Sequence, residues 1–353
     1  MTRIAVVGAG AAGLGAAYAL RDTDAEVTVF ERREAVGGRA ATHRRDDCTY
    51  DVGANYCKDD DERVRDLFAG ALADGLVDTE GPVWTFDADG EISEGRGDDA
   101  RKLTYGDGLA TLGERLREAS DATVRTETEV TGLAREGDEW RVEFESADDP
   151  LAGGDERADV LVLTPPAPAT AYLLDRADWD GTDDSLRADL VEAAADVSYR
   201  TLLSVALHYP ERTDLPYYAL VNGDKEHELG WVSREECKPG HVPEGESLLV
   251  VQPSPEWSRH RYDDADDEIA VQAADLTAEL LGDPDRYQFD WADVVRWRDA
   301  LPDSGADADV LERGADSDLF FAGDWVAGEG RIHVALRSGL EAGERVAETQ
   351  TFE

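Results

Sequence analysis

The stretch from Arg3 to Glu31 reads RIAVVGAGAAGLGAAYALRDTDAEVTVFE and decides the fold. Its apolar run Arg3–Val7 predicts a buried strand, and Leu14–Arg21 predicts a helix. Glu26–Phe30 predicts a second strand, which ends at Glu31. Because a strand–helix–strand crossover of this size joins parallel strands, the stretch predicts an α/β fold with a parallel sheet.

The turn between the first strand and the helix carries three glycines, Gly8, Gly10 and Gly13, in the pattern G-x-G-x-x-G. The first glycine permits a tight turn, the second lets a pyrophosphate approach the backbone, and the third lets the helix pack on the strand. The helix N-terminus adds free N–H groups and a positive dipole end, and Glu31 can accept hydrogen bonds from ribose hydroxyls. The motif in this context predicts dinucleotide binding, against the alternative of a glycine-rich turn used only for packing.

The composition restricts the partners. The chain of 353 residues has 35 basic and 80 acidic side chains, a net charge of −45, yet 41% of its residues are hydrophobic. That apolar share excludes wholesale disorder, and the charge argues against nucleic acid or an anionic membrane as partner. The uncharged stretch Ile4–Leu20 follows Arg3 and could pass for a signal peptide, but its patterned glycines assign it to the fold. Dispersed acid with only four lysines is typical of a cytoplasmic protein from an extreme halophile, so we expect a need for molar salt.

Cysteine usage indicates no metal. Cys48, Cys57 and Cys237 are odd in number and form no CxxC, so neither a disulfide framework nor a zinc site is expected. His208, inside an apolar run, is expected to be a hydrogen-bonded core histidine.

Beyond residue 100 the sequence predicts further strands and helices. Those assigned to the first domain are the helices Gly108–Ala119 and Arg331–Glu348 and the strands Thr123–Val130, Trp140–Glu145, Ala158–Leu163 and Asp318–Phe321. Those of a second sheet are the strands Arg200–Tyr209, Tyr217–Val221, Leu229–Ser233 and Leu248–Pro253, with the helix Ile269–Leu281 beside them.

The residues after Glu31 restrict the choice of dinucleotide cofactor. The chain continues as RREAVGGRAAT, and residues 51–56 read DVGANY. Here it resembles the flavin amine oxidase superfamily, whose FAD proteins carry E-x5-G-G-R followed by a D-x-G-A-type segment. The resemblance implies FAD as cofactor, with Arg39 at the diphosphate and Gly53, Ala54 and Asn55 near the isoalloxazine ring. A fixed guanidinium suits phosphate, and glycine permits a close backbone approach.

The C-terminal part adds a second motif of the same resemblance. Residues 319–325 read LFFAGDW, and a helix follows. The resemblance implies that Asp324 contacts the ribityl-phosphate region and that the helix start, Ile332–Val334, points at the pyrimidine edge of the flavin. The residues expected to bind FAD are therefore Gly8, Gly10, Gly13, Glu31, Arg32, Gly38, Arg39, Gly53, Ala54, Asn55, Val130, Gly323, Asp324, Ile332, His333 and Val334. No cysteine occurs from Gly323 to Phe352, where covalently flavinylated relatives have theirs, so FAD is expected to be non-covalent.

Because the two motifs lie at opposite ends of the chain, the cofactor domain is expected to be discontinuous. We expect a Rossmann-type, glutathione-reductase-like FAD-binding domain from residues 1–57, 104–166 and 286–353. Residues 58–103 and 167–285 are expected to form an inserted α+β substrate domain on a mostly antiparallel sheet.

The middle of the chain narrows the resemblance further. It reads PYYAL at 216–220, WVSREECKPG at 231–240, QPSPEWS at 252–258 and VVRWRDALP at 294–302. This series resembles the renalase-like branch, whose members oxidise off-pathway dihydronicotinamide isomers of NAD(P)H by hydride transfer to flavin and pass the electrons to dioxygen. The resemblance implies a substrate pocket with Asn55, Gln252 and Trp297 as its catalytic residues. Animal renalases have His where this chain has Gln252. Taken singly, Trp231 and Trp297 are expected to be core aromatics.

The sequence therefore predicts an FAD-dependent oxidase of the renalase-like type, with a small-molecule substrate and dioxygen as its partners and a monomer or homodimer as its state. Three alternatives stay open. One is oxidation of a small amine, although no lysine lies where many amine oxidases have one near the flavin. The second is desaturation of an apolar lipid or terpenoid, and the third is flavin binding without turnover.

Overall fold

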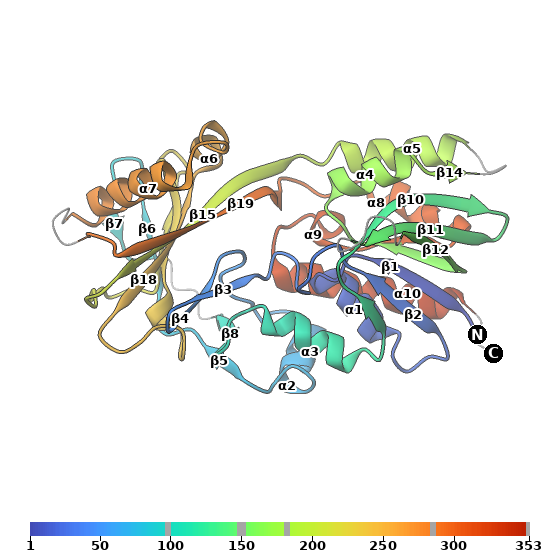
Figure 1. The fold of residues 1–353 in the computed structure, drawn as a ribbon, viewed down its shortest axis with the longest axis horizontal. Coiled ribbons are helices and arrows are strands. Elements are labelled where there is room, and N and C mark those ends of the chain that lie inside the picture. Colours follow the sequence, from blue (N-terminus) through green and yellow to red (C-terminus); the bar gives the residue numbers. More distant parts are fainter. Residues whose placement is uncertain (96–99, 147–152, 180–183, 283–286, 351–353) are drawn as a thin grey trace.

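The computed structural model describes residues 1–95, 100–146, 153–179, 184–282 and 287–350. The molecule is elongated, with a sheet at each end and the long strands β15 (Tyr199–Tyr209) and β19 (Trp291–Pro302) running between the two ends (Figure 1). Both termini lie at the end that holds the first sheet. None of the described helices combines the length and apolarity that crossing a bilayer requires.

The first sheet is parallel and contains the N-terminal unit. Its order is β20-β13-β1-β2-β9, with β1 at its centre. The strands are β1 (Arg3–Val7), β2 (Glu26–Phe30), β9 (Thr123–Arg125), β13 (Val160–Leu163) and β20 (Leu319–Phe321). The expected parallel sheet is thereby confirmed.

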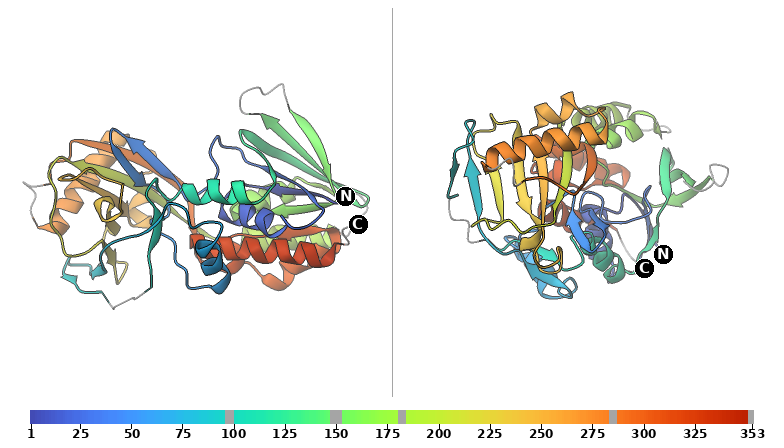
Figure 2. Two further views of the ribbon diagram at one scale, coloured as in Figure 1. Left: turned by 90° about the horizontal axis from the view of Figure 1, so that it is seen from below. Right: turned by 60° about the vertical axis from the view of Figure 1, so that its left-hand side comes forward.

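Alternate residues of β1 face two separate cores. Ile4 and Val6 pack with the helices α1 (Ala11–Ala19), α3 (Thr111–Ala119) and α10 (Ile332–Thr349). Ala5 and Val7 pack on the other face. Figure 2 shows α10, in red, running along the first sheet. Since both faces are covered, the strands read as continuous apolar runs.

A smaller sheet and two helices cover the other face. The sheet order is β12-β11-β10-β14. The elements are β10 (Thr128–Glu136), β11 (Glu139–Ser146), β12 (Gly154–Ala158), β14 (Asp178–Trp179), α4 (Ala167–Asp175) and α5 (Asp184–Ala195). The single strand expected over Thr123–Val130 is wrong: β9 and β10 belong to different sheets. The chain turns between them at Glu127, whose φ is +53°, a conformation that a continuous strand does not contain.

The sheet at the other end has seven strands in the order β19-β15-β18-β17-β16-β6-β7. Its further strands are β6 (Val83–Phe86), β7 (Ile92–Ser93), β16 (Ala219–Asn222), β17 (Leu229–Arg234) and β18 (Ser247–Pro253), beside the helices α6 (Pro255–His260) and α7 (Asp266–Leu281). Neighbours such as β15 and β18 are antiparallel, but β16 and β6 pair in parallel. The sheet is therefore mixed, where a mostly antiparallel sheet was expected: five of its six strand pairs are antiparallel, and the sixth is parallel because β6 comes from a distant earlier segment and forms no hairpin with β16.

The remaining elements connect the two ends. They are β3 (Thr42–Arg45), β4 (Cys48–Asp51), α2 (Glu62–Ala69), β5 (Leu76–Asp78), β8 (Leu103–Tyr105), α8 (Ala308–Glu312), α9 (Asp324–Ala327) and the 3₁₀ helices Glu235–Cys237 and Arg313–Ser317. The strands β3 and β4 form a hairpin, and β5 pairs with β8.

Four elements, β19, α4, α5 and α2, lie on the other side of the expected domain division. The strand β19 pairs in the seven-stranded sheet, although residues 286–353 were assigned to the cofactor domain. The helices α4 and α5 pack on the face of the first sheet that Ala5 and Val7 line. The helix α2 packs on the opposite face, in the core that contains α10. Apolar packing across the junction is the physical reason. The division stays a prediction, and its boundary at 285/286 lies outside the described residues.

Candidate active site

A cavity of about 3190 Å³ lies between the two main sheets. It is lined by the glycine turn of the first sheet, by residues 53–56, by strands of the seven-stranded sheet and by the start of α10. Of the residues expected to form the site, all line the cavity except Gly13, His333 and Val334. Typical sites for drug-sized ligands measure about 300–1,000 Å³, so this cavity has room for a dinucleotide and a second molecule.

The glycine turn has the geometry that a dinucleotide needs. Gly8 has φ of +97°, which only glycine adopts without strain. A Cβ at Gly13 would lie 1.9 Å from the carbonyl oxygen of Gly8, so helix and turn are in direct contact there. A Cβ at Gly10 would meet no atom of the described residues within 4 Å, which leaves its backbone open to the cavity. Gly13 therefore serves packing, and Gly10 serves access.

Glu31 is buried, and its carboxylate accepts two backbone hydrogen bonds that stabilise the glycine turn. One carboxylate oxygen accepts a hydrogen bond from Ala9 N at 2.9 Å, and the other accepts one from Arg33 N at 2.9 Å. The carboxylate lines the cavity and keeps further lone pairs for ribose hydroxyls. Its contact with ribose stays a prediction.

The N-terminal and C-terminal motifs meet in one ion pair. Arg39 Nη2 lies 2.8 Å from Asp324 Oδ1, and Arg39 Nη1 donates to Ala300 O at 3.0 Å. Burial by itself lowers the pKa of Arg39, but the neighbouring carboxylate of Asp324 outweighs it and the pKa is raised. Gly323, with φ of +147°, forms the turn that presents Asp324. The guanidinium is therefore permanently charged and held at the cavity wall.

The three candidate catalytic residues converge on the segment Val52–Asn55. Trp297 Nε1 donates to Val52 O at 2.9 Å, and Gln252 Nε2 donates to Gly53 O at 3.1 Å. Asn55 Oδ1 accepts from Ser233 Oγ at 3.3 Å. A Cβ at Gly53 would lie 2.0 Å from the carbonyl oxygen of Arg39, so this segment lies directly against the G-G-R turn. These three hydrogen bonds therefore connect the segment Val52–Asn55 to the seven-stranded sheet.

An aromatic wall made of Tyr56, Tyr218 and Trp231 borders the same segment. The three ring centroids lie 6.1–6.3 Å apart. Tyr56 and Trp231 line the cavity, and Trp231 Nε1 has no hydrogen-bond partner among the described residues. Sequence reasoning assigned Trp231 to the core. Trp231 lies opposite Gln252 in the pairing of β17 with β18, which would have indicated a position at the cavity. That pairing cannot be read from the sequence.

A buried ionic cluster, Asp51, Glu235, Lys238 and His241, lies below the segment and was not foreseen from the sequence. Lys238 Nζ lies 2.8 Å from both Asp51 Oδ2 and Glu235 Oε1. His241 Nδ1 is 2.9 Å from Glu235 Oε2, and its Nε2 is 2.9 Å from Tyr105 O. Both ring nitrogens of His241 thus face oxygen atoms of other residues. Lys238 is the cation that lies between the two carboxylates.

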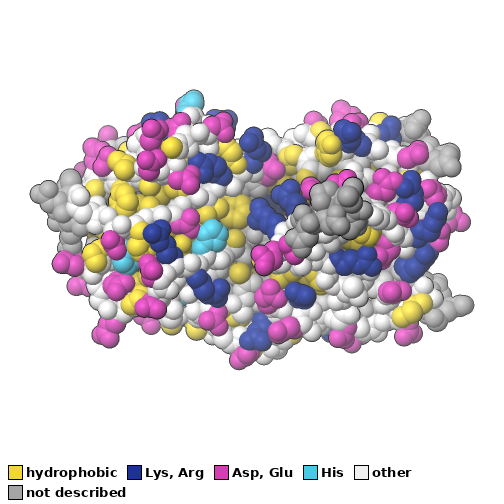
Figure 3. All heavy atoms as spheres, in the orientation of Figure 1, with side chains coloured by type: hydrophobic (Ala, Val, Ile, Leu, Met, Phe, Trp, Pro, Cys, Tyr) yellow, Lys and Arg dark blue, Asp and Glu magenta, His cyan; other side chains and the backbone are white. Residues whose placement is uncertain are grey.

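The cavity has a charge balance unlike that of the whole chain. Eleven Lys or Arg and eleven Asp or Glu residues line it, whereas the chain has 35 against 80. Four of these arginines have no carboxylate partner among the described residues: Arg32, Arg33, Arg259 and Arg298. Figure 3 shows Lys and Arg side chains, in dark blue, spread among acidic ones over the face drawn, its middle included. The cavity is therefore less acidic than the chain as a whole.

Comparison with known families agrees with this geometry. Residues 6–71 match the profile described as NAD(P)-binding Rossmann-like domain, and residues 76–347 match the profile described as flavin containing amine oxidoreductase. The second match covers more than half of the chain.

Curated relatives are similar over short segments only. A 4,4'-diapophytoene desaturase (4,4'-diaponeurosporene-forming) of Staphylococcus haemolyticus is 50% identical over 50 residues, which are 14% of this chain and 10% of the relative. An L-amino-acid oxidase of Crotalus adamanteus is 49% identical over 51 residues, again 14% of this chain and 10% of the relative. The matched segment thus spans about a tenth of the length of these relatives.

Among solved structures, a putative protoporphyrinogen oxidase from Exiguobacterium sp. 255-15 has a similar fold. The TM-score is 0.79 at 17% identity, with 99% of each chain covered. At this identity the likeness concerns the fold.

Proposed function

The chain belongs to the family of flavin containing amine oxidoreductases, and on that premise we propose that it is a renalase-like, FAD-dependent oxidase of an anionic dihydronicotinamide dinucleotide. Dioxygen is the proposed electron acceptor. The observation that carries the proposal is the balanced charge of the cavity in a strongly acidic chain, with arginines at its wall that have no carboxylate partner among the described residues.

The charge argument separates the two main candidate substrates. A chain with a net charge of −45 attracts a cationic amine through its overall field, so a cationic substrate requires no local cluster of charge at the site. An anionic substrate is repelled unless positive charge gathers at its site. Arg259 and Arg298 line the cavity without carboxylate partners, and their planar guanidinium groups match phosphate oxygens in pairs. They are the proposed contacts for the substrate pyrophosphate.

The residues that would hold FAD are those of the glycine turn with Glu31, the pair Arg39–Asp324, and Gly53. The open backbone at Gly10 fits a pyrophosphate, and the fixed Arg39 supplies positive charge beside it. Bound FAD would supply the two-electron chemistry, accepting a hydride equivalent for transfer to dioxygen. We propose that it is bound without a covalent link. Trp297 and Gln252 then act as positioning residues, since both hold the backbone of Val52 and Gly53.

A second candidate function is oxidation of a small amine. The aromatic wall favours it, because the faces of Tyr56 and Trp231 can attract a cationic or neutral amine. The name of the L-amino-acid oxidase among the relatives points the same way. The unpaired arginines have no role in that reaction.

An anaerobic titration of the bound flavin tests the proposal. The protein in molar potassium chloride is mixed separately with 2- and 6-dihydroNAD(P), with ordinary NAD(P)H and with a panel of amines. Fast loss of the oxidised flavin absorbance with the dihydronicotinamide isomers alone is the expected result. Bleaching by an amine alone would support amine oxidation and contradict the proposal. If no reductant bleaches the flavin, the result would favour flavin binding without turnover.

A pair of variants tests the arginines. The double change Arg259→Gln, Arg298→Gln is expected to raise the Kd of the dinucleotide at least about tenfold, since each charged hydrogen bond contributes about 1.5–3 kcal/mol. Arg21→Gln is the control, because Arg21 pairs with Asp22 and lies outside the cavity. Equal affinities in all three proteins would contradict the assignment.

A further inference from the structure

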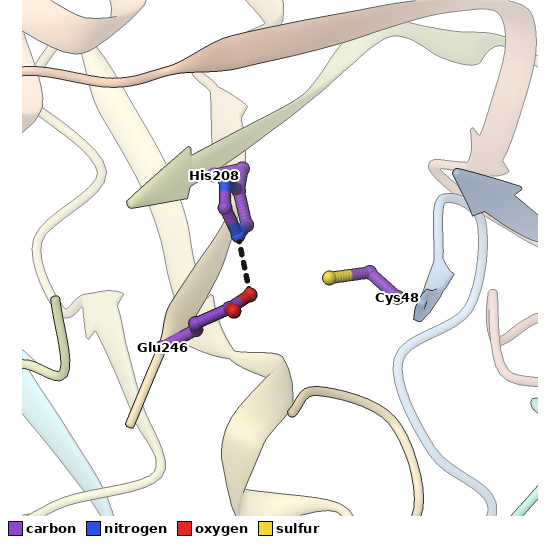
Figure 4. Close-up of side chains that lie close together, drawn as sticks. All are labelled: Cys48, His208 and Glu246. Atoms are coloured by element: carbon purple, nitrogen blue, oxygen red, sulfur yellow. Dashed lines mark hydrogen bonds and ion pairs between the residues drawn. The ribbon is translucent and has the colours of Figure 1, made fainter. Parts of the chain in front are cut away.

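A cluster of three potential metal ligands, Cys48, His208 and Glu246, lies outside the cavity (Figure 4). Cys48 begins β4, His208 lies in β15, and Glu246 directly precedes β18. Their ligand atoms all lie within 4.8 Å of one another, and His208 Nε2 is 2.9 Å from Glu246 Oε2. The close-up shows the thiol of Cys48 directed toward this pair.

The thiol has no hydrogen-bond partner among the described residues, and Cys48 is only 3% exposed. Burial raises its pKa to about 11, and the carboxylates of Glu246, Asp46 and Asp47 act in the same direction. A thiol in such surroundings is not a free nucleophile, because nucleophilic cysteines have a lowered pKa. The same negative surroundings favour a cation.

His208 is oriented as a metal-ligating histidine is. Its ring stacks on Trp291 with centroids 4.9 Å apart and an interplanar angle of 4°. Nε2 faces the cluster, while Nδ1 lies 3.8 Å from Asp290 Oδ2 and has no hydrogen bond. Metal-ligating histidines donate a hydrogen bond from their second ring nitrogen to a carboxylate, and Asp290 is the carboxylate that faces Nδ1 here, at a distance longer than a hydrogen bond.

The buried ionic cluster differs from this one because it already contains a cation. Asp51, Glu235 and His241 also bring three ligand atoms together, but Lys238 Nζ already lies between the two carboxylates as their cation. No lysine or arginine pairs with Glu246 among the described residues. Arg45, on the neighbouring strand β3, lies over the Trp291 ring at 4.7 Å.

We propose that Cys48, His208 and Glu246 bind a divalent cation of intermediate softness, for which zinc is the best match. One sulfur, one imidazole nitrogen and one carboxylate oxygen are ligands that zinc accepts, and three protein ligands leave a fourth position for water. Tetrahedral bonds of about 2.0–2.3 Å separate ligand atoms by roughly 3.3–3.7 Å, so small side-chain rotations suffice. On binding, the thiol proton leaves to solvent, the Nε2 lone pair coordinates, and the Nδ1–H faces Asp290.

The site would connect two parts of the molecule. The hairpin β3–β4 leads into Val52–Asn55 at the cavity, whereas β15 and β18 belong to the seven-stranded sheet. A bound cation would cross-link them. Glu246 has a side chain 35% exposed, which gives an ion access from solvent.

Cobalt titration of the metal-free full-length protein tests the proposal. Difference spectra against the metal-free protein are expected to show a sulfur-to-cobalt charge-transfer band that saturates at one cobalt per chain. Zinc added afterwards is expected to remove the band. Zinc is also expected to raise the Tm of the metal-free protein.

Three variants and a control complete the test. Cys48→Ser is expected to abolish the band, and Glu246→Gln and Asp290→Asn to weaken cobalt binding at least about tenfold. Cys237→Ser is the control and is expected to keep the band. Absence of the band in the unaltered protein, or its persistence in Cys48→Ser, would overturn the proposal; if Cys48→Ser does not fold, undiminished binding in Glu246→Gln would do the same.

Discussion

Gly10 directly precedes helix α1 and Gly13 lies in its first turn, and the two glycines have opposite surroundings. A Cβ at Gly10 would enter open space in the cavity, whereas a Cβ at Gly13 would overlap the carbonyl of Gly8. The same residue type therefore has a binding role at one position and a packing role at the other.

Alanine at these two positions is expected to separate binding from folding. Gly10→Ala should cost less than about 1 kcal/mol of stability but markedly weaken flavin binding. Gly13→Ala should cost roughly 1–3 kcal/mol or more, because helix α1 must shift away from the turn. Thermal melts and flavin-binding titrations of both variants measure this. Equal loss of stability in the two would contradict the division of roles.

Lys238 is the residue whose loss is expected to cost most. Lys238→Met leaves the carboxylates of Asp51 and Glu235 buried with one cation fewer, and breaking a buried pair costs about 3–5 kcal/mol. Lys225→Met, at an exposed position, is the control and should lie within about 0.5 kcal/mol of the parent. Denaturant unfolding compares them, and similar midpoints would show that the cluster does not stabilise the fold.

At the scale of elements, α10 connects the first core to the cavity. A Cβ at Gly339 would lie 2.0 Å from Ala12 O, and one at Gly343 would lie 2.5 Å from Ala16 O, so α10 packs directly on α1. This contact places the N-terminus of α10, including Ile332, at the cavity wall. His333, in the first turn, is buried and is not among the residues that line the cavity.

The first turn of α10 is expected to make stability depend on pH. Burial lowers the pKa of His333, with Arg331 acting in the same direction and Asp60 against it. The unfolded chain, with a pKa of about 6.5, then takes up the proton first, so the contribution is complete above about pH 6.5 and is lost as pH falls below it. His333→Gln should flatten the fall in Tm between about pH 7 and pH 5. An unchanged slope would assign the pH dependence to other groups.

At the scale of the whole molecule, acid excess dominates the surface while the cavity is balanced. The net charge of −45 makes like charges repel throughout the folded chain. The balanced cavity is the local exception on which the proposed anionic substrate depends.

Stability is expected to rise with salt. The Debye length falls from about 10 Å at 0.1 M to about 3 Å at 1 M, so repulsion among the carboxylates is screened. The Tm should increase steadily from low to molar potassium chloride, by about 2 °C for each kcal/mol gained. A thermal melt with the same midpoint at both salt concentrations would contradict this and the proposed halophilic origin with it.

The local features could be predicted from the sequence because they depend on neighbouring residues. The glycine turn, the buried strands of the first sheet and the helix over Ile332–Thr349 all follow from backbone requirements and periodicity within short windows. Most of the site residues named from the sequence do line the cavity, since the family resemblance carries its motifs position by position.

The tertiary structure decided what depends on residues distant in the chain. Arg39 meets Asp324 across 285 positions, and Lys238 meets Asp51 across 187. The parallel pairing of β6 with β16, the aromatic wall and the balanced charge of the cavity likewise require strands from separate segments to lie side by side. Side-chain chemistry and periodicity act over a few residues, whereas the pairing of charges and sheet edges is settled only when the two ends of the chain pack around one cavity.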